Sequence, residues 1–237
     1  PVTINQAIST GSALLNTDKT IMEGENVRNE NSPYLKMRGI TKSFPGVLAL
    51  DRVDFDLELG KVVALVGENG AGKSTLMKIL SGVYRMDAGE IFIDDKKVEI
   101  TDPLTSQNLG ISIIYQELNL LQNLNIAENI FIGKEIKKSI FVDKAKMHEE
   151  SQKLLNEVGL NVSTKTLVRD LSTAQKQMVE VAKALSFNSK IIIMDEPTSS
   201  LTDTETAILF NIIRKLKSKN VAIVFISHRM NEIFEIA

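Results

Sequence analysis

The chain has 237 residues, 43% hydrophobic and 24% charged, which is enough apolar material for the core of one domain or slightly more. Its 28 basic and 30 acidic residues give a formal net charge of -2, so composition offers no electrostatic reason to expect a nucleic-acid partner. The absence of cysteine excludes disulfides, and the longest apolar runs fall far short of the roughly 20 residues of a membrane span, so a membrane role would require a partner subunit.

The first part of the chain, residues 1–32, is polar and weakly patterned. Such a composition predicts a flexible leader, with an additional ordered strand or helix as the alternative. We expect one folded domain over residues 33–237.

Three strands are expected at the start of this domain. Residues 34–38 alternate loosely, residues 54–59 alternate strictly between polar and apolar, and residues 61–66 are almost wholly apolar. Strict alternation is typical of a strand with one solvent-exposed face, whereas a continuous apolar run suits a strand covered on both faces of a parallel sheet. A glycine-rich turn and a helix over residues 74–80 follow.

The middle of the chain has helical patterns and no convincing strand. Residues 147–158 form one predicted helix and residues 175–185 another. On the second helix, one face carries Met178, Val181, Ala182 and Leu185. We therefore predict a mainly helical subdomain, at about residues 118–185, inserted into an α/β core.

Two further apolar runs, residues 191–194 and 221–226, are predicted buried strands that flank a helix over residues 204–218. Thr202 and Glu205 have the spacing of a capping box at the start of that helix. Strand, helix and strand in this order predict a right-handed crossover and a parallel core sheet. The apolar residues of the helix recur at helical spacing, at Ile208, Leu209, Ile212, Ile213 and Leu216.

The glycine-rich turn has the sequence GENGAGKS and matches the phosphate-binding pattern G-x-x-x-x-G-K-[ST] in full. Glycines allow successive backbone N–H groups to converge on phosphate oxygens, and the helix that follows adds the partial positive charge of its N-terminus. Lys73 can reach the β- and γ-phosphates, and the Ser74 hydroxyl suits Mg²⁺. The alternative, an ordinary turn with a solvated lysine, is disfavoured by the flanking strand and helix. The predicted nucleotide-binding residues here are Gly67, Glu68, Asn69, Gly70, Ala71, Gly72, Lys73, Ser74 and Thr75.

Two carboxylates follow the apolar run at residues 191–194. Ligands of open α/β sheets bind at the carboxyl ends of the strands, where Asp195 and Glu196 emerge. We assign Asp195 to the shell of Mg²⁺ and Glu196 to activation of the attacking water, on a strand expected to neighbour the one before the glycine-rich turn. Alone, such a pair would usually be a solvated turn.

Several other motifs resemble those of the ATP-binding domains of ABC transporters, in the same order along the chain. The segment LSTAQ at residues 171–175 resembles the signature motif, Gln116 the Q-loop glutamine, and residues 199–202 the D-loop. His228 resembles the switch histidine, and Phe44 stands where that family places an aromatic ring on adenine. The resemblance covers residues 34–237.

Each of these residues also has a simpler interpretation. Gln116 could be a surface residue, His228 a satisfied histidine at a strand end, and Phe44 part of the core. Ser172 could be only a helix N-cap, or both a cap and a phosphate contact. His148, in a charged helix, is expected to be solvated.

The resemblance implies a P-loop fold of ABC type, with a mixed sheet core, antiparallel strands on the amino-terminal side and an inserted helical subdomain. It implies ATP and Mg²⁺ as cofactors, with Ser74, Gln116 and Asp195 at the metal. Phe44 and Ser172 would contact the nucleotide. Lys73, Glu196 and His228 would serve hydrolysis.

Longer segments, at residues 42–47, 114–120, 141–143, 194–202 and 226–230, are similar to those of monosaccharide importers of the galactose/methyl-galactoside or ribose type. That likeness implies the first of two ATP-binding domains, incomplete at its carboxyl end. The implied partners are transmembrane permease subunits, a second ATP-binding domain (a tandem half or another copy) and, indirectly, a periplasmic or extracellular sugar-binding protein, at the cytoplasmic face of the cell membrane. Nucleic acid is not expected.

Two departures from the family pattern leave other functions open. Thr173 and Ala174 replace a glycine pair of the signature, and Thr202 replaces an aspartate of the D-loop. They suggest a nucleotide-gated module with little turnover. A soluble ABC-type ATPase that acts on ribosomes or DNA is a further alternative.

Overall fold

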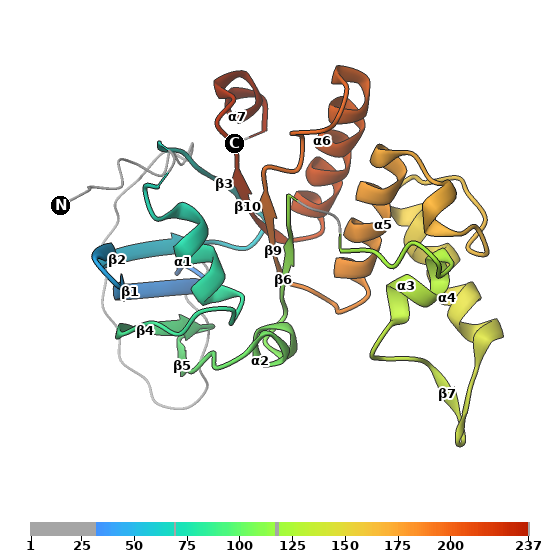
Figure 1. Ribbon diagram of the computed structural model, residues 1–237, viewed down its shortest axis with the longest axis horizontal. Helices are drawn as coiled ribbons and strands as arrows, with labels where there is room; N and C mark the ends of the chain where they lie inside the picture. Colours follow the sequence, from blue (N-terminus) through green and yellow to red (C-terminus); the bar gives the residue numbers. More distant parts are fainter. Residues whose placement is uncertain (1–31, 69, 117–118, 237) are drawn as a thin grey trace, which may run out of the picture.

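The structure, a computed structural model, describes residues 32–68, 70–116 and 119–236. Apart from Ser32, the predicted leader lies outside the described residues, as does Asn69 of the glycine-rich turn. Figure 1 shows an antiparallel sheet at one end of the molecule, a parallel sheet in the middle, and a group of helices at the other end. Among the described helices, none combines the length and the hydropathy of a membrane span.

The first sheet is antiparallel throughout. In spatial order its strands are β2 (Val47–Leu57), β1 (Leu35–Phe44), β4 (Ala88–Ile93) and β5 (Lys96–Val98). Leu35, Met37 and Ile40 of β1 are fully buried, so this face of the sheet packs into the core. The predicted strand at residues 34–38 continues to Phe44, because its second half pairs with β2 through register shifts that no simple alternation reveals.

The second sheet is parallel, as predicted. In spatial order its strands are β3 (Val62–Leu65), β10 (Ala222–Ile226), β9 (Ile191–Asp195) and β6 (Ile111–Ile114). Every residue of β9 and β10 except Asp195 is buried, which explains why these strands read as continuous apolar runs. The predicted fold class is confirmed, with the antiparallel and parallel strands in two separate sheets.

The neighbour of β3 differs from the expectation. We predicted that Asp195 and Glu196 would emerge beside the strand of the glycine-rich turn, and this is wrong. The register pairs Ile226 with Leu65 on one side and with Asp195 on the other, so β10 lies between β3 and β9. The residues after β10, which include His228, therefore emerge between the turn and the carboxylates.

Helix α6 (Asp203–Ser218) crosses from β9 to β10. Its predicted capping box is present, because the Thr202 hydroxyl accepts a hydrogen bond from the backbone N–H of Glu205 and the Glu205 carboxylate accepts one from the N–H of Thr202. The predicted apolar face is correct except for Ile208, which is 48% exposed at the edge of the stripe.

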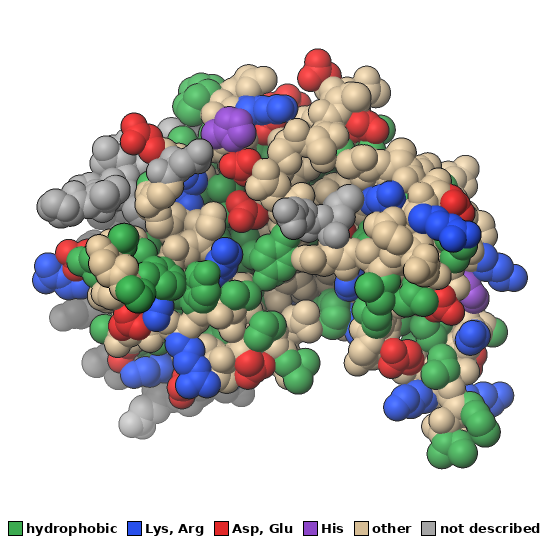
Figure 2. All heavy atoms as spheres, in the orientation of Figure 1, with side chains coloured by type: hydrophobic (Ala, Val, Ile, Leu, Met, Phe, Trp, Pro, Cys, Tyr) green, Lys and Arg blue, Asp and Glu red, His purple; other side chains and the backbone are tan. Residues whose placement is uncertain are grey.

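The helical group has α3 (Ile126–Phe131), α4 (Lys144–Glu157) and α5 (Thr173–Leu185), with a 3-10 turn at Val168–Asp170. The expectation that this part lacks strands is wrong at one place, the hairpin of β7 (Lys137–Lys138) and β8 (Phe141–Val142). Two-residue strands are too short to produce a recognisable alternation. Figure 2 shows hydrophobic and basic side chains gathered at the tip of this hairpin.

His148 of α4 is also not simply solvated. Its Nδ1 atom lies 2.9 Å from the Thr164 hydroxyl oxygen, and the residue is partly buried. This contact fastens the exposed side of α4 to the segment that follows it.

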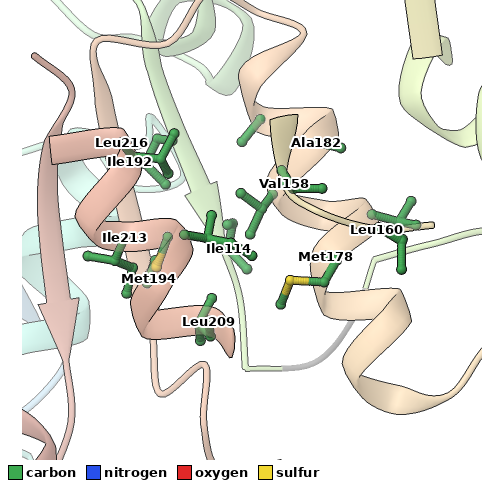
Figure 3. Close-up of a cluster of buried hydrophobic side chains, with 14 of the residues drawn as sticks. Ile114, Val158, Leu160, Met178, Ala182, Ile192, Met194, Leu209, Ile213 and Leu216 are labelled. Atoms are coloured by element: carbon green, nitrogen blue, oxygen red, sulfur yellow. The ribbon is translucent and has the colours of Figure 1, made fainter. Parts of the chain in front are cut away.

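Alternating residues of the central strands serve two separate cores. Ile192 and Met194 point to the side of α5 and α6, whereas Ile191 and Ile193 point toward α1 (Lys73–Leu80) and the antiparallel sheet. Figure 3 shows the first cluster, in which side chains of the sheet, α5 and α6 interdigitate. The helical group is thus joined to the sheet through an apolar contact. The short helices α2 (Pro103–Asn108) and α7 (Met230–Ile236) complete the fold.

Adjacent residues of α6 provide a test of this packing. Leu209 is fully buried against the sheet, whereas Ile208 is half exposed. We expect Leu209→Ala to lower the free energy of unfolding by about 2–5 kcal/mol, because it leaves a cavity. Ile208→Ala should change it by less than about 0.5 kcal/mol. Chemical denaturation measures both values, and equal losses would contradict the burial of α6 described here.

Candidate nucleotide-binding site

The glycine-rich turn is pressed against the first sheet. Gly72 has a φ of 82°, in the left-handed region that glycine adopts without strain, and it immediately precedes α1. A Cβ atom at this position would lie 2.7 Å from the carbonyl oxygen of Ala49 and 2.8 Å from the Leu50 side chain. Only glycine therefore permits the turn to approach β2 this closely at the residue that caps α1.

Lys73 lies inside the turn. Its ammonium group donates hydrogen bonds to the carbonyl oxygens of Gly67 at 2.6 Å and Glu68 at 2.9 Å. The side chain thus folds back over the loop, which differs from the geometry of a solvated lysine. Ser74 follows in the first turn of α1 and is exposed, and Thr75 beside it is partly buried.

The parallel register brings the other candidates to one edge of the sheet. Leu65, Ile226 and Asp195 are in register across β3, β10 and β9, and Met194 is paired with Ile114 of β6. Parallel strands lie roughly 4.8 Å apart, so Asp195 is about two spacings, roughly 10 Å, from the end of β3. Gln116 follows β6 by two residues and is exposed at the same edge.

Glu196 and His228 form a pair at this edge. The Nδ1 atom of His228 lies 3.4 Å from a carboxylate oxygen of Glu196. The backbone of Glu196 has a φ of 47°, which is uncommon for a residue with a side chain, and its N–H donates to the carbonyl oxygen of Ile226 at 3.0 Å. This backbone conformation is strained for a residue with a side chain, so the surrounding structure must hold it in place. Residues of this kind are enriched at functional sites.

Asp195 is half-buried, and it forms no ion pair with another residue that the structure describes. Burial raises the pKa of its carboxyl group above the usual range, and the neighbouring negative charge of Glu196 raises it further. Lys78 and Lys73 oppose this shift, which places both ammonium groups within electrostatic range of the carboxylate. The ionised carboxylate is therefore less favourable here than in water.

Phe44 lies at the far end of β1. Its ring packs edge-to-face on Tyr84, with 5.2 Å between ring centroids, and the Lys42 ammonium group lies 5.6 Å from the ring centre. The residue is partly buried, as either an adenine contact or a core residue would be. Val47 and Leu48, at the start of β2, are more than half exposed near it.

Ser172 belongs to the helical group and not to the sheet edge at which β3, β10 and β9 end. It is exposed and caps α5, with its hydroxyl accepting a hydrogen bond from the Gln175 N–H and the Gln175 amide oxygen accepting one from the Ser172 N–H. Helix α5 packs on α3, α4 and β6. Figure 1 shows α1 and α5 on opposite sides of the parallel sheet, so the helix that Ser172 caps lies across the sheet from the helix that Lys73 begins.

One charged residue near the site was not singled out from the sequence. Glu232 of α7 is 4% exposed, and its carboxylate accepts hydrogen bonds from the hydroxyls of Thr198 and Ser227 at 2.8 Å each. Its position in the helix that begins two residues after His228 was the only hint in the sequence. The burial and the two partners follow only from the tertiary structure.

Comparison with known proteins agrees with this arrangement. Residues 50–199 match the family model described as ABC transporter. The chain belongs to the ABC transporter family. The resemblance seen in the sequence motifs is thereby confirmed, and the match spans the glycine-rich turn, the signature segment and the carboxylates of this ABC domain.

The curated relatives are named as import proteins. The ribose import ATP-binding protein RbsA of Clostridium tetani is 54% identical over 217 residues, which is 91% of this chain and 43% of that protein. A Burkholderia ambifaria protein named for ribose/galactose/methyl galactoside import is 54% identical over 202 residues, 85% of this chain and 39% of that protein. The chain thus spans about two fifths of the length of these relatives.

Solved structures support the fold. The ADP conformation of MJ1267, an ATP-binding cassette of an ABC transporter, is 29% identical and superimposes with a TM-score of 0.76, covering 87% of this chain and 85% of that one.

The charge at Asp195 leads to a stability prediction. Because the pKa is raised in the folded state, ionised Asp195 disfavours folding at neutral pH. Without nucleotide and metal, Asp195→Asn should therefore raise the melting temperature at pH 7. The gain should shrink as the pH falls through the raised pKa, where the wild-type carboxyl group takes up a proton. Thermal unfolding at several pH values tests this, with exposed Asp170→Asn as the control. A lower melting temperature for Asp195→Asn at pH 7 would contradict it.

Proposed function

We propose that this ABC domain binds and hydrolyses ATP and that the hydrolysis drives import of a monosaccharide through a membrane permease. The observation that carries the proposal is that three groups follow strands ending at one sheet edge: Lys73 in the glycine-rich turn, the half-buried carboxylate of Asp195, and the Glu196–His228 pair. The ammonium group of Lys73 suits phosphate, the carboxylate of Asp195 suits a divalent cation, and the Glu196–His228 pair suits a water molecule.

The glycine-rich turn would hold the phosphates. Backbone N–H groups and the start of α1 favour an anion. The Lys73 ammonium group, which bonds two loop carbonyls, would exchange these neutral acceptors for charged β- and γ-phosphate oxygens. Phe44, with Val47 and Leu48 exposed near it, would offer an apolar surface to the adenine.

The donor set fits Mg²⁺. Ser74, Asp195 and Gln116 supply a hydroxyl, a carboxylate and an amide oxygen, all hard ligands, and the phosphates would complete the shell. Among the described residues there is no group of three or more His, Cys, Asp or Glu side chains that could cage a metal by themselves, which also suits an ion shared with a nucleotide. When bound, Mg²⁺ supplies neutralisation of phosphate charge.

Glu196 would act as the general base. Its carboxylate, beside His228, is positioned to orient a water molecule and to accept its proton as the water attacks the γ-phosphate. His228 is then available to hydrogen-bond the transferred phosphoryl group.

The separated Ser172 supports a second ATP-binding domain as partner. A helix N-terminus with a serine hydroxyl can bind phosphate, yet α5, which Ser172 caps, lies across the parallel sheet from α1, which begins at Lys73. In a head-to-tail pair, each nucleotide would lie between the turn of one domain and Ser172 of the other. The partner is either a second domain of a longer protein, as the relatives' lengths suggest, or another copy of this chain.

The names of the relatives support a monosaccharide as the transported substrate. A domain that drives a permease with ATP would lie at the cytoplasmic face of the membrane. A cavity of about 210 Å³ between α2, β6 and α5, lined by Tyr115 and Asn119 on either side of the Gln116 segment, would suit a permease loop. A sugar-binding protein would act through the permease. In the part of the chain that the structure describes, no feature favours the ribosome- or DNA-directed alternative. The capping bond of Thr202 gives a local role to the residue that replaces the D-loop aspartate.

Two variants separate binding from hydrolysis. Glu196→Gln should retain Mg-ATP affinity and lose about 10²- to 10⁴-fold in turnover, the usual contribution of a general base. Lys73→Ala should abolish ATP binding itself, because it removes the charge that meets the phosphates. Calorimetry and a phosphate-release assay measure the two effects. Normal turnover in Glu196→Gln would refute the assignment of the base.

A mixing experiment tests the head-to-tail pair. Ser172→Asp retains a good N-cap for α5 but presents a negative charge to the γ-phosphate. Lys73→Ala and Ser172→Asp should each be inactive alone. A mixture should recover activity, because a mixed pair has one intact site. If both variants fold and the mixture stays inactive, a second copy of this chain does not provide the signature.

A further inference from the structure

Glu232 carries a charge in an almost fully buried position. Its two oxygens are fully engaged: Oε2 accepts from the Thr198 and Ser227 hydroxyls at 2.8 Å each, and Oε1 lies 3.2 Å from the Arg229 guanidinium. The Ser227 hydroxyl oxygen also accepts from the Arg229 N–H at 3.0 Å. A buried carboxylate persists only with such partners, so this network is a built feature of the fold.

The partners of Glu232 belong to the two segments that carry the Glu196–His228 pair. Thr198 lies two residues after Glu196, and Ser227 immediately precedes His228. One backbone hydrogen bond, from Glu196 N–H to the carbonyl of Ile226, already joins these segments at the strand ends. The carboxylate of Glu232 adds a second connection, because it accepts hydrogen bonds from both segments.

We propose that Glu232 is a positioning residue that holds the turns after β9 and β10 in register, so that the Glu196 carboxylate and the His228 ring meet. Glu232 does not touch the reacting groups. It acts by fixing the left-handed backbone of Glu196 and the strand exit of His228 relative to one another. The inference rests on the proposed hydrolysis for its kinetic consequence, but its structural consequence is independent of any activity.

A purely structural role, anchoring α7, is the competing explanation. Glu235 of the same helix provides the matched control, because it also forms an ion pair, with Arg214 at 2.9 Å, but on the exposed side of α7. Glu235→Gln removes an α7 carboxylate from an ion pair without touching either turn.

The chain has only two histidines, so NMR of the imidazole C–H groups reads the site directly. His228 reports on the pair, and His148, fixed to Thr164 in α4, serves as the internal reference. Thr198→Val and Glu232→Gln should displace the His228 signals and leave those of His148 in place. Glu235→Gln should displace neither.

Kinetics supply the second readout. Thr198→Val and Glu232→Ala should lower kcat by about 10- to 100-fold, as expected for misplaced reacting groups, while KM for ATP changes little. Glu232→Gln, which can still accept from both hydroxyls, should recover part of the loss. If Glu232→Ala does not fold, Thr198→Val alone carries this test, because it removes one donor and leaves the carboxylate in place.

These outcomes separate the positioning role of Glu232 from the proposed hydrolysis of ATP. Unmoved His228 signals in Thr198→Val and Glu232→Gln would overturn the positioning role whether or not the chain hydrolyses ATP. Displaced signals with unchanged kcat in an active protein would also overturn it. If the wild-type chain shows no ATP turnover, the proposed function fails, and displacement of the His228 signals alone still upholds the role of Glu232 in joining the turns.

Discussion

The arrangement of the candidate site depends on the parallel pairing of β3, β10 and β9. Backbone hydrogen bonds align Leu65, Ile226 and Asp195, so the glycine-rich turn, the His228 turn and the carboxylates leave the sheet at one edge. A slip of one residue would move a strand end by roughly 3.3 Å and turn each side chain to the opposite face. The two apolar cores on either side of the sheet therefore hold the chemistry in register.

Three acidic residues lie near this edge, each in a different environment. Glu232 is buried and satisfied by hydroxyl and guanidinium donors, whereas Glu196 is paired with His228 and held in a left-handed conformation. Asp195 is half-buried with a raised pKa and makes no ion pair with another described residue. Its ionised form is therefore unfavourable in the fold, and the proposed Mg²⁺ would relieve that charge.

The position of Ser172 gives the molecule two complementary faces. The glycine-rich turn belongs to the sheet, and Ser172 belongs to the helical group that is joined to the sheet through the apolar cluster of Figure 3. Because α5 and α1 lie on opposite sides of the sheet, the proposed head-to-tail pair would use the glycine-rich turn of one domain and Ser172 of the other. The apolar cluster of Figure 3 would transmit any movement of α5 to the sheet.

The sequence by itself determined the elements whose signals are local. The glycine-rich turn, the buried strands around Asp195 and Ile226, and the caps at Ser172 and Thr202 could all be predicted, because backbone geometry and periodicity act over a few residues. Only the tertiary structure decided that β10 separates β3 from β9, that Ile208 is exposed, that α5 lies across the sheet from α1, and that Glu232 joins two turns. Strand order and long-range hydrogen bonds arise from packing between distant segments, and no pattern within one segment encodes which neighbour it meets.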